Sequence, residues 1–159
     1  MEEIRRRIVP NEVMLGEVKK MIAEGRQVNI KVKGVSMLPF IVGDRDSVLL
    51  SQPVDLAVSD IVLGEIEEGR YVLHRIKAMQ GDDITMMGDG NLRGTEQCLR
   101  KNVVGKVVKI IRNGVGVDPY SPKEKRKVAA WLMLTPIRRY LLAIYRRLPG
   151  HRHLLLPTV

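Results

Sequence analysis

The sequence has little of what would place it in several large classes of protein. It holds one cysteine among 159 residues, Cys98, so no disulfide can form within the chain and a reducing compartment is favoured. Only 4% of the residues are aromatic, so a core must rest on valine, isoleucine, leucine and methionine. No apolar segment approaches the roughly 20 residues that span a bilayer, and none of signal-peptide length follows the first residues. We therefore expect a cytoplasmic protein, with the inner face of the membrane as the alternative location.

The positive charge of the chain is concentrated at its C-terminal end. The formal net charge is +9, and residues 123–159 carry nine lysines or arginines against one acid. A basic tail favours an anionic partner such as lipid headgroups, nucleic acid or an acidic protein, and the alternative is a solvated helix face. Nucleic acid ranks low, because aromatics for base stacking are few and no nucleic-acid-binding motif is recognised. The oligomeric state is left open.

The order of the periodic segments predicts a mainly β domain between two helical segments. Apolar residues recur at helical spacing over residues 11–24, whereas the centre of the chain holds short alternating or apolar runs with turn residues every ten residues or so. We expect an α+β fold, mainly β and barrel-like. Its parts would be an N-terminal helical segment over 1–25, a β domain over 26–118 and a basic C-terminal helical segment over 119–159.

The C-terminal segment contains an amphipathic helix that needs a partner. Thr135 and Pro136 supply a cap and a first-turn proline for a helix that runs to about Leu148. Its apolar stripe must be buried, either against the β domain or on an anionic membrane. The stripe consists of Ile137, Tyr140, Leu141, Ile144 and Leu148, with Arg138 and Arg147 at its flanks and Arg139 and Arg146 opposite.

Three segments of the β region carry residues that could react together. Ser36 lies at a junction between a strand and a turn, His74 lies within a strand, and Asp89 lies in a turn whose glycines tolerate positive φ. A serine becomes a nucleophile when a base is within hydrogen-bond reach, and histidine titrates near working pH. Taken singly, each is more often structural, because serines in such turns usually satisfy backbone groups. Spacing alone therefore carries little weight.

In their order along the chain, four boxes resemble those of type I signal peptidases and the related LexA-type self-cleaving repressors. They are Gly34-x-Ser36-Met37-x-Pro39 with Gly43-Asp44, then Asp60-Ile61-Val62-Leu63, then His74-Arg75-Ile76, then Gly88-Asp89-Gly90-Asn91. In the second box Ser59 stands where the family has glycine. In the third box a histidine replaces the lysine of the common bacterial enzymes, so the chain is similar to the archaeal and endoplasmic-reticulum type.

The resemblance implies a barrel-like peptidase domain with Ser36 as nucleophile and His74 as general base. Histidine-type members usually carry a further aspartate five or six residues beyond the aspartate of the last box, but here those positions hold Gly94 and Thr95, and Glu96 follows. Either Asp89 or Glu96 would then orient the imidazole. By the same resemblance, the oxyanion and substrate site would be formed by Gly34, Val35, Met37 and Pro39.

The sequence thus predicts a serine endopeptidase that cleaves a leader or signal-type peptide and needs no cofactor. The alternative is a catalytically decayed module on the same fold that binds a peptide by edge-strand addition. Gly34 favours decay, because the family often has a hydroxyl residue there that helps to hold the oxyanion. Retention of both Ser36 and His74 argues against it. One cysteine without clustered partners argues against a zinc site, and His151 and His153 are typical of a solvated tail.

Overall fold

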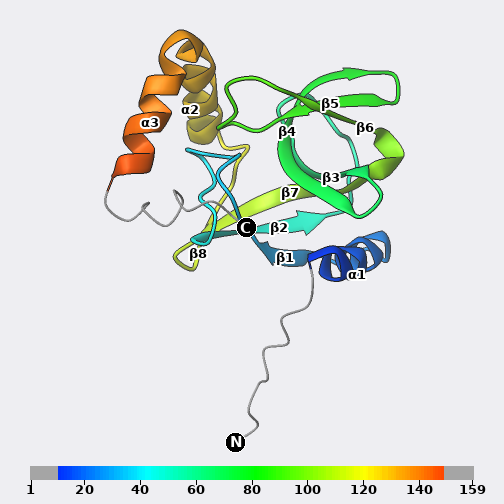
Figure 1. The fold of residues 1–159 in the computed structure, drawn as a ribbon. Coiled ribbons are helices and arrows are strands. Elements are labelled where there is room, and N and C mark those ends of the chain that lie inside the picture. Colours follow the sequence, from blue (N-terminus) through cyan, green and yellow to red (C-terminus); the bar gives the residue numbers. More distant parts are fainter. Residues whose placement is uncertain (1–10, 149–159) are drawn as a thin grey trace, which may run out of the picture.

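The computed structural model describes residues 11–148, so His151 and His153 lie outside the described residues. In this part of the chain, eight strands form one antiparallel sheet that is flanked by three α-helices (Figure 1). The strands are β1 (Val28–Lys31), β2 (Asp46–Ser51), β3 (Ile61–Glu67), β4 (Arg70–Gln80), β5 (Asp83–Met87), β6 (Glu96–Leu99), β7 (Val103–Arg112) and β8 (Val115–Val117). The helices are α1 (Asn11–Ala23), α2 (Pro122–Met133) and α3 (Arg138–Arg147), with 3-10 turns η1 (Arg100–Asn102) and η2 (Thr135–Ile137). The predicted α+β, mainly β class is confirmed.

The sheet is curled but not closed. Its strand order is β1-β2-β7-β3-β4-β5-β6, with β8 paired to β7, and the strands at the two ends of this path do not pair with each other. Glycines with positive φ close two of its hairpins, Gly69 between β3 and β4 and Gly81 between β4 and β5. Asn113 and Gly114, both with positive φ, form the tight turn between β7 and β8. No helix within residues 11–148 has the length and apolar character needed to cross a bilayer.

Two hydrophobic clusters fill the two sides of the sheet. On one side β3, β4, β5 and β6 curl around the first, in which Gly64 of β3 lies against the Met86 side chain. This cluster contains Val62, Ile76, Ile84, Met86, Cys98 and Val103. On the other side α1 covers the sheet with Val18 and Ile22, and Gly105 lets it approach closely. Burying each such aliphatic side chain stabilises the fold by about 1.5–3 kcal/mol.

The C-terminal helices pack together on the loop that contains Ser36. A third cluster joins Leu38 and Val42 of that loop to Trp131 of α2 and Leu142 of α3. Figure 1 shows these helices at the opposite end of the molecule from α1. Ser121 caps α2, since its hydroxyl accepts a hydrogen bond from the Glu124 N–H at 3.3 Å.

The face of α3 that is buried differs from the predicted stripe. Leu142 and Arg138 are buried, and Leu141 and Tyr145 are partly buried. The stripe residues Ile137, Tyr140, Ile144 and Leu148 are exposed, so most of the predicted stripe does not contact the β domain. The predicted cap is also wrong, because Thr135, Pro136 and Ile137 form η2 and α3 begins at Arg138 without a side-chain cap.

Candidate active site

The loop from residue 34 to residue 45 holds Ser36 through close backbone contacts and a buried carboxylate. Gly34 has a φ of 82°, and a Cβ on Gly43 would lie 2.3 Å from the Gly34 carbonyl oxygen. The fully buried carboxylate of Asp46 accepts hydrogen bonds from the Val42 N–H at 2.9 Å and from Arg45 Nε at 2.7 Å. The hydroxyl residue that the resembled family has at position 34 would be strained here, because L side chains rarely adopt such a φ.

The predicted oxyanion and substrate residues differ in exposure. Ser36 and Pro39 are half-buried and Gly34 is exposed, whereas Val35 packs on the cluster formed with α2 and α3. Met37 is only 2% exposed and lies in the core beneath α1, so only its backbone could take part in binding. Among the described residues, no group accepts a hydrogen bond from the Ser36 N–H. That N–H is therefore available to hold an oxyanion.

His74 and Glu96 meet on the concave face of the curled sheet. The strand register pairs Ile76 with Met86 and Met86 with Glu96, and directly paired residues share a face. His74 lies two residues before Ile76 on that same face, and its Nδ1 atom is 2.8 Å from Glu96 Oε2. The His74 side chain is 5% exposed and that of Glu96 27%.

The contact between His74 and Glu96 bears on the tautomer of the imidazole. Within residues 11–148, neither Nδ1 of His74 nor Oε2 of Glu96 has a hydrogen-bond partner, so the two atoms lie at ion-pair distance without the geometry of a hydrogen bond. Because buried polar atoms are nearly always paired, a proton on Nδ1 directed at Oε2 would satisfy both. With that proton on Nδ1, Nε2 carries the lone pair and can accept a proton.

Asp89 has a different partner. Arg75 Nε and Nη2 each donate to one oxygen of the Asp89 carboxylate, both at 2.8 Å. Because His74 and Arg75 are consecutive in β4, their side chains leave opposite faces of the sheet. Of the two acids that the sequence leaves open, Glu96 is therefore the one in contact with the imidazole. Asp89 instead ties its turn to β4, and its carbonyl accepts a hydrogen bond from Trp131 Nε1 at 2.8 Å.

The turn around Asp89 lies directly against the Ser36 loop. The Gly90 N–H donates to the Ser36 carbonyl at 2.8 Å, and a Cβ on Gly88 would lie 2.3 Å from that same oxygen. Neither glycine has a positive φ, so the predicted reason for them is wrong: they are required by close approach of two backbones. Gly88 follows Met87, which pairs with Arg75. Gly88 thus joins the end of β5 to the backbone of Ser36.

The second box supports β4 from the side. Ser59 has a φ of 80°, which glycine adopts at lower cost, and its carbonyl accepts a hydrogen bond from Arg75 Nη1 at 2.9 Å. Asp60 is buried and pairs with Lys106 Nζ at 2.9 Å. The sequence does not predict this ion pair, because Lys106 belongs to β7, which is far from Asp60 along the chain although it pairs with β3 in the sheet.

The described residues show no arrangement suited to a metal. No three His, Cys, Asp or Glu side chains among residues 11–148 gather as they would around a metal ion. In comparisons with known proteins, no family model matches the sequence, and no curated protein matches it. The function must therefore be argued from the residues of the site.

Proposed function

We propose that the protein is a serine endopeptidase that cleaves a leader or signal-type peptide, with Ser36 as nucleophile, His74 as general base and Glu96 as the acid behind the imidazole. The observation that carries this proposal is the 2.8 Å contact between His74 Nδ1 and Glu96 Oε2, in which the imidazole is almost fully buried. A histidine held in this way keeps Nε2 free as a base, which is what a serine nucleophile requires.

The chemistry would follow the acyl-transfer route. Ser36 Oγ attacks the scissile carbonyl carbon while His74 Nε2 takes the hydroxyl proton, and Glu96 stabilises the imidazolium that forms. The free N–H of Ser36 holds the negative charge on the carbonyl oxygen. The proton then passes from Nε2 to the leaving amine, and the acyl-enzyme remains. Water attacks this ester with His74 again as base, which releases the acid product and restores Ser36.

The sheet offers an edge to an extended substrate. Within the described chain β1 pairs only with β2, so its second edge is unpaired, and the residues after it lead directly to Ser36. A peptide that added to this edge would run toward the serine. A decayed peptide-binding module would use the same edge, so binding alone does not separate the two functions.

A serine-directed fluorophosphonate probe tests the proposal. We expect the probe to label the wild-type protein and Ser51→Ala, a control at another half-buried serine, but not Ser36→Ala. Circular dichroism checks that each variant is folded. Labelling of Ser36→Ala at the wild-type rate would remove Ser36 from the role of nucleophile. A folded wild-type protein that binds unstructured peptides but resists the probe would support the decayed module instead.

A further inference from the structure

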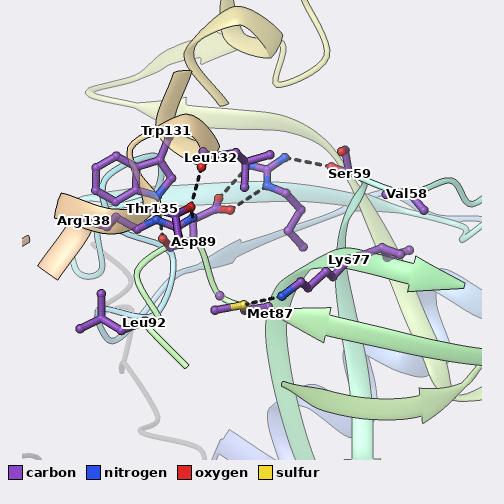
Figure 2. A pocket seen from close by; sticks show the side chains of 13 residues that line it. Val58, Ser59, Lys77, Met87, Asp89, Leu92, Trp131, Leu132, Thr135 and Arg138 are labelled. Atoms are coloured by element: carbon purple, nitrogen blue, oxygen red, sulfur yellow. Dashed lines mark hydrogen bonds and ion pairs between the residues drawn. The ribbon is translucent and has the colours of Figure 1, made fainter. Parts of the chain in front are cut away.

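A pocket of about 300 Å³ lies between β4, β5 and the helices α2 and α3 (Figure 2). Arg75, Ile76 and Lys77 of β4 contribute to its lining, whereas Ser36, His74 and Glu96 do not. Gly88, which lies against the Ser36 carbonyl, also lines it, so the pocket borders the Ser36 loop. It nevertheless contains none of the three proposed catalytic residues, and an inference about its ligand goes beyond the proposed peptidase function.

One wall of the pocket is a buried arginine without a counter-charge. Arg138 is 6% exposed, and no carboxylate within residues 11–148 forms an ion pair with it. Its Nε atom has no hydrogen-bond partner among those residues. Nη1 reaches the Asn91 carbonyl only at 3.5 Å, and Nη2 reaches Thr135 Oγ1 at 3.2 Å. An arginine normally uses its five donors on carboxylates or phosphates, and a buried charge without a partner is unfavourable.

The remaining charges of the pocket leave it electropositive. The charge of the Asp89 carboxylate is neutralised by Arg75, which donates two hydrogen bonds to it at 2.8 Å. Lys77 lies at an exposed position of the lining, and its Nζ atom lies 3.7 Å from Met87 Sδ. Two cations, Arg138 and Lys77, therefore face the pocket without a described carboxylate partner. A bound anion would compensate both.

The other walls are apolar. Leu92, Trp131 and Leu132 line the pocket, and the Trp131 ring also stacks on Arg138 at 5.4 Å from the guanidinium carbon. A volume of about 300 Å³ is at the lower end of the range for ligand sites, so the ligand should be small. We propose that this pocket binds a small organic carboxylate with an apolar body. The carboxylate would pair with Arg138 and Lys77, and the body would lie against Leu92, Trp131 and Leu132.

Trp131 makes this proposal directly measurable, because it is the only tryptophan of the chain. The full-length protein is titrated with octanoate while tryptophan fluorescence is recorded, and octylammonium serves as the probe with the same apolar body and the opposite charge. We expect a saturable change with octanoate and none with octylammonium. Absence of saturation by about 10 mM octanoate, above the millimolar affinity of a weak ligand, would overturn the proposal. An equal response to octylammonium would overturn it as well.

Variants identify the residues that bind the anion. Arg138→Gln should weaken octanoate binding about tenfold or more, since it removes a charge-assisted hydrogen bond. Arg139→Gln, at the next and exposed position of α3, is the matched control and should bind as the wild type does. If circular dichroism shows that Arg138→Gln does not fold, octanoate binding is measured with Lys77→Gln instead. Lys77 is exposed, so this variant should fold, and loss of its positive charge should weaken octanoate binding severalfold. Unchanged octanoate binding by a folded Arg138→Gln, or by Lys77→Gln in its place, would refute the assignment.

Discussion

The pairing of Glu96 with His74 leads to a quantitative prediction for Glu96→Gln. The substitution keeps the size of the side chain and its ability to accept a hydrogen bond from Nδ1, but it removes the charge that stabilises the imidazolium. A charge-assisted hydrogen bond contributes about 1.5–3 kcal/mol, and each 1.36 kcal/mol is tenfold in rate, so the reaction should slow by roughly 10- to 150-fold. Because the Glu96 side chain is 27% exposed, screening by solvent favours the lower end of that range.

The assay is the second-order rate constant of fluorophosphonate labelling at Ser36, measured beside the free energy of unfolding in urea. Asp89→Asn provides the contrast, because it breaks a buried bidentate ion pair with Arg75. We expect it to lower the free energy of unfolding by about 3–5 kcal/mol, whereas Glu96→Gln should change it by about 1 kcal/mol or less. Labelling of Glu96→Gln at the wild-type rate, with Ser36→Ala inert, would show that Glu96 does not act through His74.

Two further predictions concern the buried carboxylate of Asp46 and the C-terminal helices. Burial raises the pKa of the Asp46 carboxyl, but hydrogen bonds from Arg45, the Val42 N–H and Arg112 outweigh this and hold the pKa below its usual value. A lowered folded-state pKa contributes stability above the unfolded value of about 3.9, and this stability is lost as the pH falls through the folded value. Asp46→Asn should therefore lower the free energy of unfolding by about 3–5 kcal/mol at neutral pH. Measured by urea unfolding, the difference between wild type and variant should become smaller in acid. A difference that does not depend on pH would contradict this prediction. The exposed apolar residues of α2 and α3, among them Met133 and Ile144, predict that the full-length protein sediments with phosphatidylglycerol vesicles at low salt, and that Ile144→Asp sediments less; a protein that ignores such vesicles would contradict the membrane hypothesis.

Local pattern was sufficient for most elements of the fold. The turn residues Glu67-Glu68-Gly69 predict a hairpin that leads into a strand over 71–78, and β4 covers Arg70–Gln80. Helical spacing predicts a helix over residues 11–24, and α1 covers Asn11–Ala23. β6 could not be predicted in this way, because its four residues bury only Cys98 fully and gain their order from pairing with β5. β8 was missed as well, although the Asn113-Gly114 turn before it is a strong local signal for a hairpin.

The buried face of α3 shows where tertiary packing overrides a helical pattern. The apolar stripe places Arg138 at its flank, and nothing in the pattern predicts that this residue is buried. In the structure the Arg138 guanidinium stacks on the Trp131 ring and lines the pocket beside it. Leu142 of α3, and not Ile144, packs on the loop that contains Ser36. An amphipathic pattern specifies that a helix has two faces, but the partner surface decides which residues border the buried one.

The acid of the candidate site is decided by strand register, which no spacing between motifs contains. The family resemblance points to Asp89 because it stands in a turn of the expected kind. However, side chains alternate along β4, so His74 and Arg75 leave opposite faces of the sheet. Asp89 pairs with Arg75 and not with His74. Glu96 reaches His74 because Met86 pairs with both Ile76 and Glu96, which puts all four side chains on one face. A shift of one residue in the pairing of β5 with β6 would turn Glu96 away from His74. Of the two strands that sequence analysis did not predict, β6 is thus the one that supplies the partner of the proposed base.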